Sequence, residues 1–197
     1  MNLTEMITLV RRELKDESSN LWSDDELTRH IDRALKELSE RISLPAKATL
    51  ATTAGSREVD ISAITDRIMV QAVEYPIGET PQEFQRFSLW GDTLVILSGD
   101  EPDGSDCCIY YGKLHTLDAV TSTVPAKHED LVAAGAAGNA AISWGVYAVN
   151  RVNVGGVATA REYRIWGKER LRFFTQEVNR LGRRSRLRTQ QLHKPLL

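Results

Sequence analysis

This chain of 197 residues has little of what secreted, membrane-spanning and metal-binding proteins need. Its two cysteines, Cys107 and Cys108, are adjacent, which is too few for a zinc site and poorly placed for an ordinary disulfide. The N-terminus, MNLTEMITLVRREL, has no apolar run of signal-peptide length, and no later stretch approaches a membrane span. We therefore expect an intracellular site of synthesis, no membrane partner, and two half-buried strand cysteines.

Groups arranged for catalysis or metal binding are also missing. His30, His115, His128 and His193 show no metal-ligand spacing, and we interpret His30 as a surface residue. Gly155-Gly156 lacks the Lys-Ser/Thr of a phosphate-binding loop, and no nucleophile motif is present. The sequence therefore predicts no catalytic residues, no cofactor site and no metal site.

What is present is the composition of an ordinary globular protein with an uneven charge. Hydrophobic residues make up 42% of the chain and charged residues 26%, and the length suits one domain with a sizeable core. Residues 180–197 contain five arginines, one lysine and no acidic residue, a charge of +6. Because the whole chain carries −2, the other 179 residues carry −8. The C-terminal tail and the body therefore favour different surroundings.

The most strongly specified stretch is WSDDELTRHIDRALKELSERI, residues 22–42. Ser23 and Glu26 have the spacing of a capping box, and Trp22 and Leu27 have the spacing of a hydrophobic staple. We interpret the three acids at residues 24–26 as partners of the helix dipole rather than as a functional site. A second apolar stripe lies upstream, so residues 1–44 predict two helices joined by the polar loop 16–20.

The hydrophobic period changes from 3.6 to 2 between about residues 47 and 117. Turns containing glycine separate the short apolar segments, and Gly91-Asp92 has the form of a two-residue hairpin loop. We predict an antiparallel meander in which the first two strands pair around residues 53–56. The predicted strands cover residues 47–52, 57–61, 67–75, 87–90, 93–97 and 107–114.

A helical pattern returns after Pro125. Residues 131–149 are rich in alanine and glycine, which lets another helix approach closely, and a last helix is expected from about Thr159 to the stop signal Gly182. The fold class is therefore α+β: a mainly α-helical bundle of two N-terminal and two C-terminal helices, with an inserted antiparallel β-meander. We expect one domain, residues 1–181, with helices in 1–44 and 126–181 and the β-rich insertion in 47–117. Residues 182–197 are expected to form an extended basic tail.

Three stretches carry a resemblance to a known family. The first is LTEMITLVRRELKDESSNLWSDDELTRHIDRALKELSERI, and the second is the strand CCIYYGKLHTL followed by VTSTVPAKHEDLVAAGAAGNAA. The third is the last helix, ATAREYRIWGKERLRFFTQEV. Their order resembles the head–tail adaptor proteins of tailed bacteriophages, in which a Trp-Ser-Asp-x-Glu-Leu helix start recurs. The likeness covers most of residues 1–181, and the strand region 47–117 is longer than we can map onto the family.

The resemblance implies a structural protein of the virion neck that is not an enzyme. Such a protein would be one subunit of a ring, usually a homododecamer, docked under the portal protein. The ring would continue the DNA channel without sequence-specific DNA binding and would carry the next neck or tail protein. It would be made in the cytoplasm of the host bacterium.

The C-terminal tail leaves three interpretations open: docking on the portal, a solvated segment, or contact with DNA phosphates. For portal docking, the arginines would meet acidic groups and the leucines would fill apolar pockets. The alternative function is a nucleic-acid-associated binding module that uses the basic tail, although no recognition-helix or RNA-binding sheet motif supports it. The candidate portal-binding residues are Arg183, Arg184, Arg186, Leu187, Arg188, Leu192, Leu196 and Leu197.

Overall fold

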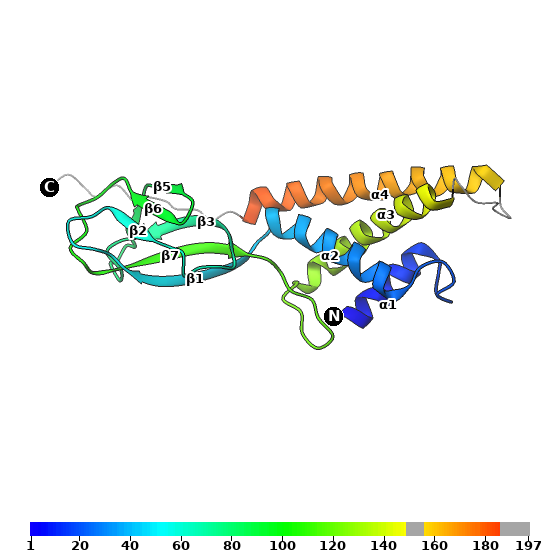
Figure 1. Cartoon of the computed structure of the whole chain (residues 1–197), viewed down its shortest axis with the longest axis horizontal. Helices are drawn as coiled ribbons and strands as arrows, with labels where there is room; N and C mark the ends of the chain where they lie inside the picture. The colour runs from blue at the N-terminus through cyan, green and yellow to red at the C-terminus, as the bar shows by residue number, and fades with distance from the viewer. Residues whose placement is uncertain (149–155, 186–197) are drawn as a thin grey trace. The chain divides into compact units, whose positions relative to one another are not determined.

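The computed structural model describes residues 1–148 and 156–185, and side chains of the last helix from Ala160 onward. The chain divides into two compact units (Figure 1). The helical unit contains Met1–Ile42 and His115–Arg184, and the strand unit contains Ser43–Leu114. Helices and antiparallel sheets together confirm the α+β class.

The helical unit has four α-helices and one short 3-10 turn within the described residues. Capping boxes begin the first two helices, formed by Asn2 with Glu5 and by Ser23 with Glu26. The second of these confirms the start predicted from the sequence, because Ser23 Oγ accepts from the Glu26 N–H at 3.2 Å. The elements are α1 (Leu3–Leu14), α2 (Asp24–Arg41), η1 (Ala126–His128), α3 (Glu129–Ala148) and α4 (Gly156–Ser185).

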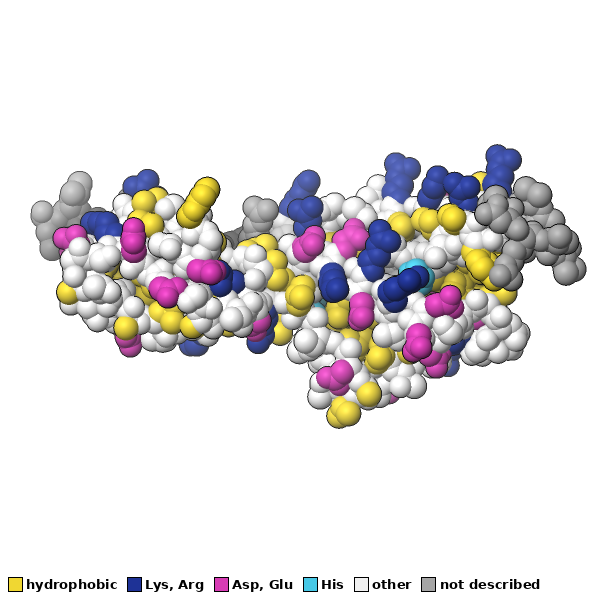
Figure 2. Space-filling view, viewed as in Figure 1, with side chains coloured by type: hydrophobic (Ala, Val, Ile, Leu, Met, Phe, Trp, Pro, Cys, Tyr) yellow, Lys and Arg dark blue, Asp and Glu magenta, His cyan; other side chains and the backbone are white. Residues whose placement is uncertain are grey.

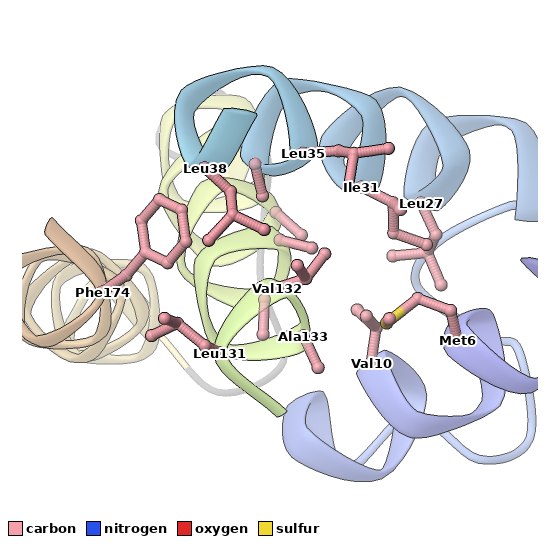
Figure 3. Close-up of a cluster of buried hydrophobic side chains, with 14 of the residues drawn as sticks. Met6, Val10, Leu27, Ile31, Leu35, Leu38, Leu131, Val132, Ala133 and Phe174 are labelled. Atoms are coloured by element: carbon pink, nitrogen blue, oxygen red, sulfur yellow. The ribbon is translucent and has the colours of Figure 1, made fainter. Parts of the chain in front are cut away.

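Apolar side chains from all four helices form one core (Figure 3). Met6 of α1 faces Leu27 of α2, while Phe174 of α4 lies against Leu38 and Leu131. Apolar residues recur every three or four positions along α2, and these residues form the buried side of the helix. The helix predicted from this spacing is therefore confirmed. Trp22, which precedes the cap, is buried in the same core.

α3 is the central helix of this unit, and most of its surface is covered by protein. It is long and apolar enough to cross a membrane by length and composition, which corrects the expectation that no stretch approaches a span. The apolar window, however, is 72% buried inside the protein, as in the core helix of a globular fold. Its alanines and glycines are buried, and its glycines lie against α4.

Glycines set the distance between α3 and α4. A Cβ at Gly138 would lie 3.0 Å from the carbonyl oxygen of Gly167, and a Cβ at Gly167 would lie 2.8 Å from that of Gly138. At Gly135 the added atom would meet the ring of Phe174 at 2.9 Å. The predicted close helix approach is therefore present, and it brings backbone against backbone.

The expected stop at Gly182 is wrong, because α4 continues to Ser185. Gly182 is buried, and a Cβ there would lie 2.9 Å from the carbonyl oxygen of Arg41 at the end of α2. This glycine permits a close contact between helices and does not end α4. Residues 183–185 are thus helical rather than part of an extended tail, and the remaining tail, 186–197, lies outside the described residues.

The strand unit contains two antiparallel sheets, with strand orders β1-β7-β3-β4 and β2-β6-β5. The predicted strand positions are matched, and β5 and β6 form the expected hairpin around Gly91. β4 was missed, since it is only two residues long within the predicted polar loop. The strands are β1 (Leu44–Ala51), β2 (Glu58–Asp60), β3 (Arg67–Glu74), β4 (Phe84–Gln85), β5 (Phe87–Trp90), β6 (Thr93–Ile96) and β7 (Asp106–Lys113).

The sequential meander is wrong in its topology. β1 pairs with β7, from Leu44 opposite Lys113 to Ala51 opposite Asp106, and β2 pairs with β6 rather than with β1. Local turn signals suggested a hairpin at 53–56, but pairing between distant strands decides the sheet. β1 is an edge strand, which accommodates Pro45.

The two sheets share one core of apolar side chains. Val59 and Leu94 come from the smaller sheet, and Val73 and Ile109 come from the larger one. Cys107 belongs to this core, and both cysteines are free and buried rather than half-buried. Burial raises the pKa of the Cys107 thiol to about 11, so it is protonated at neutral pH and a poor nucleophile.

Candidate interaction surfaces

The predicted portal-binding residues lie at and beyond the end of α4. Arg183 and Arg184 are exposed in the last turn of this helix, where cations complement the helix dipole. Arg186, Leu187, Arg188, Leu192, Leu196 and Leu197 lie outside the described residues. The structure therefore brings two of the eight candidates together on one helical turn.

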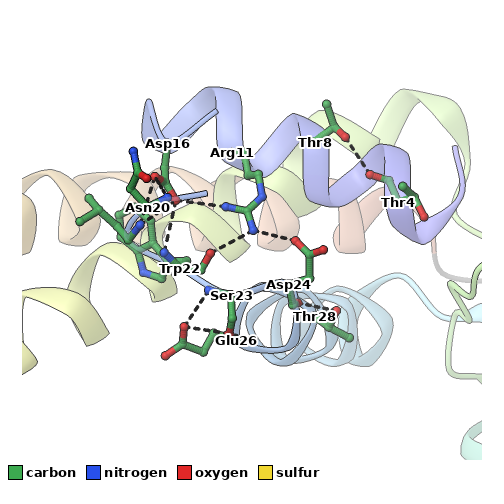
Figure 4. A network of polar contacts seen from close by, with 11 residues as sticks. Thr4, Thr8, Arg11, Asp16, Asn20, Trp22, Ser23, Asp24, Glu26 and Thr28 are labelled. Carbon is green, nitrogen blue, oxygen red and sulfur yellow. Dashed lines mark hydrogen bonds and ion pairs between the residues drawn. The ribbon is translucent and has the colours of Figure 1, made fainter. Parts of the chain in front are cut away.

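The loop before α2 is organised by a buried ion pair (Figure 4). Arg11 is 7% exposed and Asp16 is 4% exposed, and the guanidinium Nη1 lies 3.1 Å from Asp16 Oδ2. Asp16 also accepts from the backbone N–H groups of residues 20–22 at 2.8 to 3.3 Å. These bonds hold the loop in one conformation.

The same arginine reaches the start of α2. Arg11 Nη2 donates to the carbonyl oxygen of Trp22 at 3.0 Å and to Asp24 Oδ1 at 2.6 Å. The expectation that Asp24 serves only the dipole is therefore incomplete, because it also closes a salt bridge to α1. Helical spacing alone does not reveal this role, because the partners of Arg11 lie 5, 11 and 13 residues away, in the loop and at the start of α2.

Basic side chains form a stripe along the exposed side of α4. Five exposed cations fall within roughly a 100° sector of a helix with 3.6 residues per turn. The acidic residues of α4 lie outside this sector, and Figure 2 shows basic side chains gathered over α2 and α4. The first four cations, from Arg161 to Arg172, follow one another at spacings of three and four residues, and this spacing is the signal in the sequence that predicts the stripe. The α4 stripe consists of Arg161, Arg164, Lys168, Arg172 and Arg183.

A groove of about 580 Å³ lies between the end of α1 and the first half of α4. Its apolar lining includes Leu9, Tyr163 and Trp166, and the Arg170 guanidinium lies 5.4 Å from the centre of the Trp166 ring. Arg170 also forms an ion pair with Glu13 across the groove. Aromatic walls beside fixed cations suit a partner with an apolar group and nearby negative charge. We call this the α1–α4 groove; its remaining lining residues are Arg12, Leu14, Lys15 and Glu162.

The β5–β6 hairpin presents apolar side chains to solvent. Trp90 is 88% exposed, the highest value among the exposed large hydrophobic residues of the described chain, and Leu97 is 56% exposed. Figure 2 shows hydrophobic side chains at the surface of the strand unit. The turn of this hairpin was predicted from Gly91-Asp92. The alternation of apolar and polar residues, however, does not show which strand side chains remain exposed to solvent.

The interpretation of His30 as a surface residue is wrong, since it is 6% exposed on the buried side of α2. Burial, and after it the charge of Arg29, lowers the pKa of His30 below its ordinary value of 6.5. His115 is also buried, with Nε2 3.0 Å from the carbonyl oxygen of Ile42. Among the described residues, no three His, Cys, Asp or Glu side chains are grouped to hold a metal ion. These histidines belong to the packing of the helical unit.

Comparison with known proteins identifies a family for the chain. The model of the family described as SU10 adaptor protein matches residues 1–190 of the chain. A comparison with curated proteins gives no match. The matched family is one of structural proteins of the virion, and the resemblance found in the sequence is thereby confirmed. The chain belongs to the SU10 adaptor protein family, a family of phage head–tail adaptors.

Proposed function

We propose that this protein is the subunit of a ring, of twelve copies, that docks under the portal protein of the virion. The ring extends the DNA channel and provides the platform on which the next neck or tail protein assembles. In this proposal residues 1–181 act as one adaptor domain, made in the cytoplasm of the host bacterium. Membership of the head–tail adaptor family over residues 1–190 carries the proposal.

The portal contact is assigned to the end of α4 and the tail that follows it. Arg183 and Arg184 are exposed on the last helical turn, and the next residues of the chain add Arg186 and Arg188. Guanidinium groups bind carboxylates through paired hydrogen bonds, and leucines between them would occupy apolar pockets.

Truncation tests this assignment without cutting a described helix. Removing residues 186–197 leaves α4 complete, and we expect at least a tenfold loss of affinity for the isolated portal, measured by interferometry. Electron microscopy of the portal mixed with the full chain should show a stacked ring, which the truncated chain fails to form. Unchanged affinity after truncation, and again in an Arg183→Gln/Arg184→Gln variant, would contradict the assigned contact. Absence of a ring with the full chain would contradict the function itself.

The α4 stripe favours a second function, as a nucleic-acid-associated module. Exposed cations in a row along a helix can meet successive phosphates, and such binding weakens steeply with salt. Under this alternative the monomer alone should bind duplex DNA, with affinity falling as salt rises. Charge removal at Lys168 and Arg172 should then reduce binding equally for all sequences. Absence of duplex binding at low salt would reject this alternative.

A further inference from the structure

The exposed indole of Trp90 has no cover within the described protein. Tryptophan is among the residues most enriched at the centres of protein interfaces, and a large apolar side chain in water marks such a contact. Leu89, which precedes it in β5, is 43% exposed but lies on the other face of the strand, opposite the buried Leu94, so Trp90 alone is the candidate anchor. The tip of the β5–β6 hairpin therefore has the composition of a binding anchor.

The backbone turn that carries this anchor is tied to the rest of the strand unit. Gly91 supplies the positive φ of the turn, and the guanidinium of Arg67 forms an ion pair with Asp92. Arg67 also donates to the carbonyl oxygens of Ile61 at 3.1 Å and Ile64 at 2.6 Å, which ties the turn to the rest of the strand unit. Because this turn is already ordered, its backbone loses little conformational entropy when the hairpin binds. The hairpin is thus preorganised for insertion into a recess.

The same chain carries a recess of matching character. The α1–α4 groove, at about 580 Å³, is large enough for an indole, and its walls include the rings of Tyr163 and Trp166. Aromatic rings favour tilted and edge-to-face contacts with another ring. The groove can therefore receive a tryptophan from outside.

Charge also favours a contact between these two surfaces. Ser43–Leu114 contains eleven acidic and five basic residues, a net charge of −6, whereas residues 156–185 contain eight basic and three acidic residues, a net charge of +5. Opposite charges steer two surfaces together and penalise contacts between like surfaces. A strand unit is therefore attracted to the exposed basic side of α4 in another copy, whose charge differs in sign from the net −5 of residues 1–42 and 115–148, and is repelled by another strand unit.

We propose that Trp90 of one copy inserts into the α1–α4 groove of the neighbouring copy and makes the contact that closes the ring. This inference rests on the proposed ring and names the surfaces that build it. The contact is heterologous, because each copy offers the anchor on one surface and the groove on another. Such a contact repeats from copy to copy until the rotation closes.

Two single variants and their mixture test this arrangement. Trp90→Ala removes the anchor and leaves the groove, while Leu9→Arg blocks the groove and leaves the anchor. Each variant alone should fail to form a ring on the portal in electron microscopy, and native mass spectrometry should show only monomers. An equal mixture should give heterodimers and nothing larger, because only one productive contact remains. Val120→Ala is the matched control, since Val120 is 85% exposed but belongs to neither surface, and it should form rings like the unmodified chain.

A photo-crosslinker locates the contact directly. With p-benzoylphenylalanine replacing Trp90, crosslinked peptides should come from residues 9–15 or 162–170 of a second copy, identified by mixing isotope-labelled and unlabelled protein. Rings formed normally by Trp90→Ala, or crosslinks mapping elsewhere, would overturn this contact while leaving the proposed function intact. If the unmodified chain forms no ring on the portal, the proposed function fails and this contact fails with it.

Discussion

The helices α2 and α3 are buried to different extents and by different means: α2 buries one side, whereas α3 buries most of its surface. The start of α2 is determined by side chains close in sequence: Ser23 and Glu26 cap it, and Arg11 and Asp16 fix the loop before it. α3 carries no charged residue after its first turn and depends on atoms of other helices, above all on backbone contact with α4 at Gly138. Hydrogen bonds and an ion pair determine where α2 begins, whereas close packing against α4 determines the position of α3.

Among the substitutions that test this difference between α2 and α3, loss of Asp16 should lower the stability most. Asp16→Ala removes the acceptor for the N–H groups of residues 20–22 and one of the two carboxylates around the buried Arg11. We expect the free energy of unfolding to fall by about 3 to 5 kcal/mol, as for a broken buried ion pair. Urea denaturation monitored by circular dichroism measures it.

Ser23→Ala is the matched control for that loss, since it removes a hydrogen bond at the exposed end of the same segment. A missing N-cap costs about 1 kcal/mol. Asp16→Asn keeps one acceptor oxygen and should fall between the two variants. If Asp16→Ala costs no more than Ser23→Ala, the buried ion pair does not organise the loop.

Filling the contact between α3 and α4 should have the next largest effect. Gly167→Ala places a Cβ 2.8 Å from the carbonyl oxygen of Gly138, so the helices must separate. Alanine favours a helix by about 1 kcal/mol, but overpacking costs about 1 to 3 kcal/mol, so we expect net destabilisation. Thermal unfolding should show a lower Tm, whereas Gln176→Ala, on the exposed side of α4, should leave Tm unchanged or slightly higher. A higher Tm for Gly167→Ala would show that α4 adjusts freely.

The smallest of the expected effects is the contribution of His30 on α2 to the pH dependence of stability. The pKa of His30 on α2 is lowered by burial, so the folded state binds fewer protons than the unfolded state. Its stabilising contribution is complete above the ordinary value of 6.5 and is lost as pH falls below it, by at most about 1.4 kcal/mol per pH unit for one proton. His30→Gln should therefore flatten the fall in stability between pH 7 and pH 5.

The control for this pH effect lies on α3. Asn139 is a buried amide that does not titrate, so Asn139→Ala should change stability without changing its slope against pH. His128, whose pKa burial also lowers, keeps its own share of the slope in both variants. Equal slopes for His30→Gln and the unmodified chain would show that His30 is protonated without cost in the fold.

Local signals were enough to predict the helices and most strands, and they failed where distant segments decide. The capping box at Ser23 and the turn at Gly91 are complete within a few residues, and both predictions are confirmed. The pairing of β1 with β7 joins residues about sixty positions apart, and no turn residue encodes it. Gly182 illustrates the same limit, because its neighbour is the carbonyl of Arg41 on another helix.

The surfaces were harder to predict than the fold. The basic tail was visible as a run of like charge, but the α4 stripe is spread over 23 residues and becomes a surface only on a helix. Trp90 lies in an ordinary strand pattern, so its sequence context does not distinguish it from a buried strand residue. It is exposed because no other described segment packs over it. His30 is the opposite case: its polar neighbours in the sequence indicated an exposed side chain, but packing against other helices buries it.

The pairing of the first and last strands brings the two ends of the strand unit side by side. Leu44 lies opposite Lys113, so the chain enters and leaves this unit at neighbouring positions. In the helical unit, His115 donates its N–H to Ser39 Oγ at 3.0 Å, which fixes the point of return close to the end of α2. A change in the length of a loop between these points would therefore leave the entry and exit of the strand unit adjacent.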